Sequence, residues 1–479
     1  MRPMTRNLRY ILAVNLLVVI PDWGLAWNIF SIEHAARVAS RYENVYLLDL
    51  SMLNPKISRS RLSGLRDLLF RKNSIQKAIA EICSREGIKL ITPASSDSYS
   101  SHVVEDLLFN NTFKLAMASK YSWITGNGQT TLNQIDSKLV AKELEYFKYT
   151  YTVTSGLILE LGIDKVTTVN GRFLIDGAVK LAADNLGKET SLLESGFGKI
   201  HTYEEFEVSP HDIFNRRKII SSCWQNGSND KYQVAEEGFR EKYAGTTGDG
   251  ISWQDKFEIE YSPPPESTKK IAVFFPSAQL EKPIFEDIGI SKTFSGDQVV
   301  AFRAFCHSAR SKGFHVVVRV HPRGHYPKSV ADSENRFWSE VCLALGAEIV
   351  QAESPISSYS LIEKSDLCIV YSSSIAIEVI AQSKPLLVLG ETEYSQLIDE
   401  NCCHSISRLS EMLDQEIPII EKSRVYPWLY YFMKGGYQFK YFTVDNFGRY
   451  TFKNRQVNER TLVSKILRKM LTYDRLVEN

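Results

Sequence analysis

The sequence has few glycines, prolines and cysteines, and almost no net charge. Its 26 glycines and 16 prolines among 479 residues exclude collagen-like and largely disordered chains. The 57 basic and 56 acidic residues give a net charge of +1, which argues against a nucleic-acid-binding protein. The seven cysteines are scattered without CxxC spacing, so we expect neither a disulfide framework nor a structural zinc site. A reducing cytoplasm suits such cysteines.

Long hydrophobic runs are also missing. No apolar stretch reaches the roughly 18–20 residues that a membrane span requires. Residues 9–20 could be mistaken for a signal peptide, but Asn15 interrupts the run and Pro21 follows it without a small-residue cleavage site. We therefore expect residues 9–20 to form the first buried β-strand.

Apolar runs alternate with helical patterns in two blocks, residues 1–250 and 269–425, which indicates βαβ units on mostly parallel sheets. The intervening residues 251–268 contain three consecutive prolines and predict a linker. The sequence thus predicts an α/β chain of two Rossmann-like domains facing a central cleft, where ligands usually bind. We expect strands at residues 9–20, 45–49, 88–92, 166–169, 190–193, 270–275, 314–320, 347–350, 367–371 and 385–389.

The final segment, residues 426–479, interleaves aromatic with basic side chains and predicts a helix near 459–474. Three interpretations remain open. The segment packs across the cleft, touches an anionic membrane surface, or supplies core aromatics flanked by solvated lysines.

Polar residues follow the strands of the second block, where open α/β sheets bind ligands. Arg319 and His321 end one strand and could contact a phosphate, or they could be a solvated arginine and a turn histidine. Ser277 ends the first strand of the block, and Gln298 opens the next helix. These two form a weaker candidate for phosphate or sugar contact.

Ser372, Ser373 and Ser374 separate another strand from its helix. They could bind an anion, cap the helix, or do both. Glu378 follows one turn later and could accept hydrogen bonds from a ribose, or simply be favoured by the helix N-terminus.

Polar residues also follow strands of the first block. Asn170 and Arg172 come after one strand, Glu194 ends the next, and Asp22 and Asp97 lie at earlier strand ends. A carboxylate there could act as a general base, although polar loop residues need no function.

Several segments of the second block occur together in one order. They are Phe275–Glu281 with Gln298, Arg319–His321–Pro322, Ser358–Ile362, Ser365–Asp366, Tyr371–Ser374 with Glu378, and Lys384–Pro385. In this order the chain resembles the capsule polysaccharide biosynthesis proteins, which are glycosyltransferases of the GT-B fold similar to Kdo transferases.

The resemblance implies transfer of a sugar from a nucleotide-sugar, for instance CMP-activated Kdo, to a growing capsular or surface polysaccharide or its lipid-linked acceptor. His321, Ser372 and Ser373 would contact the donor phosphate, and Glu378 the nucleoside. Asn170 and Arg172 would lie on the acceptor side. The same resemblance implies a C-terminal helix that returns toward the first domain.

Glu194, or alternatively Asp22 or Asp97, would deprotonate the acceptor. No DxD motif ends a strand, so we expect no obligatory metal ion, and no cofactor besides the nucleotide-sugar substrate. The alternatives are a GT-B sugar-nucleotide epimerase, a polyol-phosphate transferase, and a non-catalytic polysaccharide assembly or export factor. A lipid-linked acceptor would bring a cytoplasmic enzyme to the inner face of the membrane.

Overall fold

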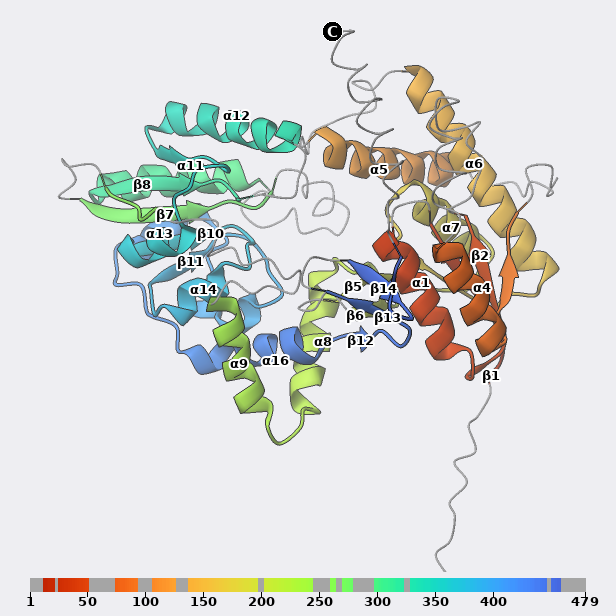
Figure 1. Ribbon diagram of the computed structural model, residues 1–479. Coiled ribbons are helices and arrows are strands. Elements are labelled where there is room, and N and C mark those ends of the chain that lie inside the picture. Colours follow the sequence, from red (N-terminus) through yellow and green to blue (C-terminus); the bar gives the residue numbers. More distant parts are fainter. Residues whose placement is uncertain are drawn as a thin grey trace, which may run out of the picture.

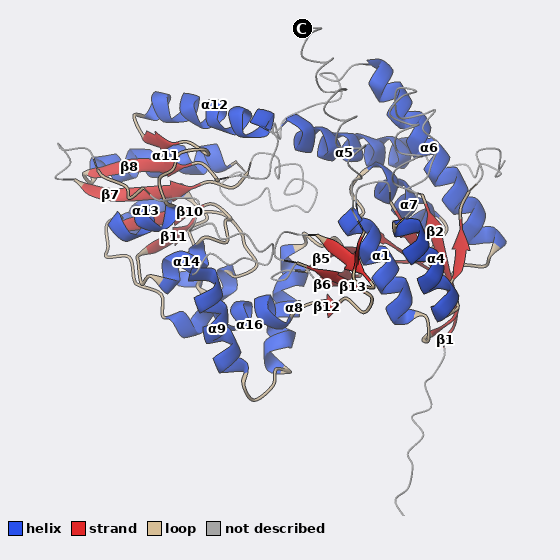
Figure 2. Cartoon of the chain, in the orientation of Figure 1, coloured by secondary structure: helices blue, strands red, loops and turns tan. Residues whose placement is uncertain are grey.

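The computed structural model contains two α/β domains, each built on its own sheet (Figure 1). Helices cover the strands of both sheets (Figure 2). The residues that the structure describes are 12–21, 25–50, 74–93, 106–125, 137–196, 202–243, 259–263, 269–278, 297–322, 328–445 and 449–457.

The first sheet has the strand order β12-β6-β5-β4-β1-β2-β3. The strands from β5 to β3 are parallel, whereas β6 and β12 are antiparallel to their neighbours. The strands are β1 (Leu12–Ile20), β2 (Tyr42–Asp49), β3 (Lys89–Ile91), β4 (Lys165–Val169), β5 (Glu189–Ser195), β6 (Thr202–Phe206) and β12 (Tyr437–Gln438).

Both faces of this sheet are covered, which explains the apolar run from Leu16 to Ile20 in β1. Leu17 and Val19 pack into one hydrophobic core, while the alternate residues Leu16, Val18 and Ile20 pack into the other. The covering helices are α1 (Leu25–Val38) and α4 (Ile75–Glu86) on one face, and α5 (Asp106–Thr125), α6 (Ser137–Glu160) and α7 (Leu174–Asn185) on the other.

The second sheet is entirely parallel, with the strand order β11-β10-β7-β8-β9. Its strands are β7 (Lys270–Phe275), β8 (Phe314–Arg319), β9 (Glu348–Val350), β10 (Leu367–Val370) and β11 (Leu386–Val388). Its helices are α11 (Gln298–Ser311), α12 (Lys328–Leu345), α13 (Ser358–Lys364), α14 (Ala376–Ala381) and α15 (Ile406–Leu413). Each predicted strand overlaps an observed one, so the α/β class and the two Rossmann-like domains are confirmed.

Three helices connect the domains: α8 (Ile213–Gln225), α9 (Lys231–Tyr243) and α16 (Tyr426–Lys434). Although α8 and α9 follow the first sheet in sequence, Ile220, Val234 and Phe239 share one core with the second sheet and α16. Of the predicted linker, residues 259–263 are described, and Ile259 pairs with Ile356 beside α13. The rest of 251–268 lies outside the described residues, so the division at residues 250 and 269 stays a prediction.

After α16 the chain returns to the first domain as a strap, residues 437–457. β12 of the strap extends the first sheet by pairing with β6. The strap also forms a small antiparallel sheet beside β12 (Figure 1). Its strands are β13 (Phe442–Val444), β14 (Tyr450–Phe452) and β15 (Arg455–Gln456). The buried carboxylate of Glu33 on α1 accepts the backbone N–H groups of Lys440, Tyr441 and Phe442 at 2.6, 2.7 and 2.8 Å.

Two Rossmann-like domains with a returning C-terminal segment form the GT-B-type arrangement expected from the sequence. α16 packs against α8 and α9, and Trp428 and Tyr431 on α16 are buried. The described part of the segment therefore both bridges the domains and supplies core aromatics. The predicted helix at 459–474 lies outside the described residues. No helix in the described ranges is long and apolar enough to cross a membrane.

Candidate active site

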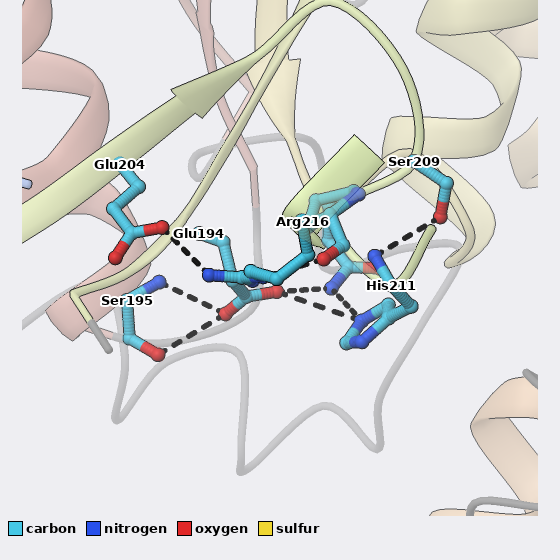
Figure 3. Close-up of polar contacts among 8 residues, drawn as sticks. Glu194, Ser195, Glu204, Ser209, His211 and Arg216 are labelled. Carbon is cyan, nitrogen blue, oxygen red and sulfur yellow. Dashed lines mark hydrogen bonds and ion pairs between the residues drawn. The ribbon is translucent and has the colours of Figure 1, made fainter. Parts of the chain in front are cut away.

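Three polar side chains meet at the carboxyl end of the first sheet, and we call them the acid–imidazole cluster: Asn170, Glu194 and His211. Figure 3 labels Glu194 and His211 of this cluster. Asn170 follows β4, Glu194 lies near the end of β5, and His211 lies in the loop from β6 to α8. Asn170 Nδ2 donates to Glu194 Oε2 at 2.5 Å and lies 3.3 Å from His211 Nε2. His211 Nε2 lies 3.8 Å from the same carboxylate oxygen.

The turn after β4 positions Asn170 for this contact. Asn170 has a φ of +55° and Gly171 a φ of +82°, a left-handed conformation that asparagine and glycine adopt most readily. On the other side of the cluster, Asp212 caps α8 by accepting the N–H of Asn215 at 3.0 Å. The helix cap fixes the backbone next to His211.

Burial sets the protonation of this cluster. It raises the pKa of Glu194 above the usual 4.5, although the Ser195 N–H, 2.9 Å from Oε1, and the charge of Arg172 act in the opposite direction. Burial also lowers the pKa of His211 well below 6.5, and the charges of Arg172 and Arg216 lower it further. At neutral pH, His211 is therefore uncharged and Glu194 binds a proton more readily than an exposed glutamate.

A second buried carboxyl, Asp176, lies in the first turn of α7 behind the cluster. Thr168 donates a long hydrogen bond of 3.4 Å to its Oδ1, and within the described residues Oδ2 has no hydrogen-bond partner. Burial raises the pKa of Asp176 well above 3.8, and the neighbouring charge of Glu194 also raises it. Burial thus opposes ionisation of both carboxyl groups, and the pKa of Asp176 is the more strongly raised.

A second group of polar residues, the serine cluster, lies at the carboxyl end of the second sheet and comprises Ser277, Gln298, Ser372 and Ser373. The hydroxyls of Ser277 and Ser372 are 2.7 Å apart, and Ser277 Oγ also accepts the Ser372 N–H at 3.2 Å. Gln298 holds the Ser277 backbone from both sides, accepting its N–H at 3.0 Å and donating to its carbonyl at 2.9 Å. The structure thus brings Ser277 and Ser372 together as neutral hydrogen-bonding groups.

The neighbouring candidates on this side differ in exposure. Ser374 is exposed, whereas Glu378 is buried on α14. Lys242 Nζ, from α9, lies 3.3 Å from Glu378 Oε1 and sits over the ring of Phe432 at 5.2 Å. Glu378 Oε2 has no hydrogen-bond partner in the described part of the chain. One oxygen is therefore paired, and the other could accept a ligand hydroxyl.

Arg319 does not join the serine cluster. Its buried guanidinium donates to the carbonyls of Gln351 and Ser354 and, at 3.3 Å, to Ser358 Oγ, so it holds the loop from β9 to α13. Burial lowers the pKa of Arg319 to about 10. His321, two residues later, is exposed beyond the end of β8.

α8 connects the two clusters. It begins two residues after His211, and Arg217 Nε donates to the Thr392 carbonyl at 2.9 Å in the loop that follows β11. From the same loop, the Tyr394 hydroxyl donates to the Ser373 carbonyl at 2.7 Å. α8 therefore connects the loop that carries His211 to the loop that contacts the serine cluster.

The sequence interpretation missed three groups at these sites: His211, Asp176 and Lys242. The segment Ser209–Asp212 before a helix was the only local signal for His211. Asp22 and Asp97, predicted as alternative bases, lie outside the described residues. The described residues contain no group of three or more His, Cys, Asp or Glu that could hold a metal ion.

No protein family and no curated protein matched the chain. Among solved structures, it is similar to a β-Kdo 2,4-transferase, KpsC, of Thermosulfurimonas dismutans, with 12% identity over 56% of this chain and 79% of that one and a TM-score of 0.34. It is also similar to S. aureus MnaA in a structure with UDP (12% identity, 91% and 94% coverage, TM-score 0.27). A UDP-GlcNAc 2-epimerase of Neisseria meningitidis gave 11% identity, 96% and 100% coverage and a TM-score of 0.27.

Proposed function

We propose that this chain is a glycosyltransferase that moves a sugar from a nucleotide-sugar to a growing surface or capsular polysaccharide or its lipid-linked precursor. One observation carries the proposal. A buried carboxylate with a raised pKa lies at the end of one Rossmann-like sheet, hydroxyl groups line the end of the other, and α8 joins the two.

The second domain would bind the donor. Breaking the bond to the anomeric carbon leaves negative charge on the departing phosphate, which the hydroxyls of Ser277 and Ser372 and the imidazole of His321 would stabilise. Preorganised hydrogen-bond donors of this kind contribute about 2.7–4 kcal/mol each in other enzymes. Glu378 Oε2 would accept a ribose hydroxyl. We propose that this charge stabilisation needs no divalent ion and that the donor is of the CMP-activated acidic-sugar class.

The first domain would activate the acceptor. As the acceptor oxygen forms its bond to the anomeric carbon and the bond to phosphate breaks, the ionised Glu194 takes the proton of the acceptor hydroxyl. The raised pKa of Glu194 favours this transfer because it increases the affinity of the carboxylate for the proton. Asn170 holds the carboxylate in place. A lipid-linked acceptor would place the reaction at the inner face of the membrane.

The test combines the purified chain with labelled CMP-, UDP- and GDP-sugars and a bacterial lipid extract as acceptor. Label in the lipid or glycan fraction is expected with one donor class. Conversion of the nucleotide-sugar without acceptor would indicate an epimerase, and glycan binding without turnover would indicate an assembly factor. Either result, or failure to bind any nucleotide by calorimetry, contradicts the proposal.

His321 offers an internal control on the donor side. Because His321 is exposed, His321→Ala should leave the Tm nearly unchanged while lowering the rate of transfer by about 10²–10³-fold. A large fall in Tm would show instead that His321 stabilises the turn after β8.

A further inference from the structure

Phe214 is unusual among the phenylalanines that the structure describes. It lies in the first turn of α8 and is 56% exposed, and it is the only exposed phenylalanine among the residues that the structure describes. Burial of a phenylalanine side chain ordinarily stabilises a fold by roughly 1.5–3 kcal/mol. Because the Phe214 ring is exposed, it contributes little of this stabilisation to the fold. We therefore consider a role for Phe214 in ligand binding.

The ring is supported from one side. The guanidinium of Arg217, one turn along α8, lies over the Phe214 ring with its carbon 5.4 Å from the centroid. Arg217 is itself fixed, because it donates to the Thr392 carbonyl at 2.9 and 2.7 Å and pairs with Glu391. The Phe214 ring is thus held in place by Arg217, at the point where α8 contacts the second domain.

Phe214 is also close to the acid–imidazole cluster. Phe214 follows His211 by three positions, so the two Cα atoms lie within about 11 Å of each other. Val208, three residues before His211, is 42% exposed as well. Exposed apolar residues therefore precede and follow His211 in the chain.

We propose that Phe214 is the platform on which the terminal pyranose of the acceptor glycan stacks. This inference rests on the proposed glycosyltransferase function and deepens it by naming how the acceptor is held. A pyranose has one face of C–H groups and a rim of hydroxyls. The C–H face packs on the aromatic ring, and the rim directs a hydroxyl toward Glu194.

Saturation-transfer difference NMR tests stacking without requiring turnover. The probes are the methyl glycosides of glucose, N-acetylglucosamine and Kdo, mixed separately with the full chain. Saturation of the ring C–H protons of at least one glycoside is expected with the wild type. Phe214→Ala should lose this saturation, and Phe214→Tyr should retain it.

Tyr232→Ala is the matched control, since Tyr232 on α9 is 59% exposed but belongs to an aromatic cluster with Trp224. It should leave the saturation unchanged. Equal saturation with Phe214→Ala and the wild type, equal loss with Tyr232→Ala, or no saturation of any glycoside by the wild type would each overturn the proposal. Matching Tm values exclude misfolding as the cause of a loss.

Kinetics separate this inference from the proposed function. Phe214→Ala should raise the KM for the acceptor about tenfold, leaving nucleotide binding to the second domain within twofold of wild type. Transfer by the wild type combined with an unchanged acceptor KM in Phe214→Ala would overturn the platform alone. Absence of transfer and of nucleotide binding in the wild type would overturn the proposed function.

Discussion

The carboxyl ends of the two sheets differ in chemistry although both end parallel strands. The first holds titratable groups whose pKa values burial shifts, namely Glu194, His211 and Asp176. The second holds the neutral hydroxyls of Ser277 and Ser372, 2.7 Å apart. Shifted carboxylates suit proton transfer, and hydroxyls suit a charge that appears on a ligand. The comparison indicates that the acceptor is activated at one edge and the leaving group stabilised at the other.

The largest expected effect is at the first edge. Glu194→Gln removes the proton acceptor while keeping the size of the side chain, so transfer should fall by about 10²–10⁴-fold. Steady-state rates with saturating donor and acceptor measure this. Nucleotide binding, monitored by calorimetry, should remain as in the wild type. A rate within threefold of wild type would mean that proton transfer occurs elsewhere.

A variant of Arg319 tests which residues belong to the second edge, because Arg319 is the last residue of β8 yet its side chain holds the loop before α13. Arg319→Ala removes buried charge-assisted hydrogen bonds, and we expect a loss of about 2–4 kcal/mol in the free energy of unfolding. Thermal and urea denaturation measure the loss, with Arg319→Lys as the milder variant. If stability is preserved and only nucleotide affinity falls, Arg319 belongs to the donor site after all.

Buried titratable groups of the first domain also predict that the free energy of unfolding depends on pH. His34 on α1 is the clearest example. Burial lowers the pKa of His34 on α1 to about 4, although the charge of Glu205 raises it. The unfolded chain therefore takes up this proton first as the pH falls below 6.5. The stabilisation is complete above pH 6.5 and is lost as the pH falls toward 4, so that about 2 kcal/mol of the free energy of unfolding has been lost at pH 5.

Tm values measured from pH 7 to pH 5 test this prediction. Wild type should lose more stability over that interval than His34→Gln, whatever the absolute stability of the variant. Parallel Tm profiles for the two proteins would show that His34 titrates normally.

The smallest effect belongs to the serine cluster. Ser277→Ala removes one neutral hydroxyl, and a hydrogen bond of this kind contributes about 1 kcal/mol, so nucleotide affinity should fall roughly fivefold. Calorimetry with the nucleotide identified in the transfer assay measures it. Ser374→Ala, at an exposed position, is the comparison variant and should change affinity less. A reversed order would move the binding surface from Ser277 toward Ser374.

Much of the fold was predictable because both sheets are covered on two faces. Apolar runs such as Leu16–Ile20 then mark strands directly. β6 was not predicted, since its residues Thr202–Phe206 include two glutamates and it pairs antiparallel near the sheet edge. The sequence predicts the strap only as a segment that returns to the first domain, because its partners Glu33 and β6 lie far from it in sequence.

The candidate site was predictable only in part. Asn170 and Glu194 follow neighbouring parallel strands, so their meeting follows from topology. His211 contacts them from the loop after β6, an antiparallel strand that the sequence pattern did not predict. Arg319 shows the opposite error, since adjacency to His321 in sequence does not place its side chain beside the same ligand. The hydrophobic pattern predicts strand order, but it does not predict contacts that depend on the direction of a side chain.

The three N–H groups that Glu33 accepts have a practical consequence for dissecting this chain. A cut within residues 251–268 would not yield two self-sufficient halves. The N-terminal piece would lose the donors that satisfy the buried Glu33, together with the outermost strand of its sheet, while carrying away α8 and α9 from the core of the other piece. Co-expression of both pieces should therefore restore solubility that neither shows alone.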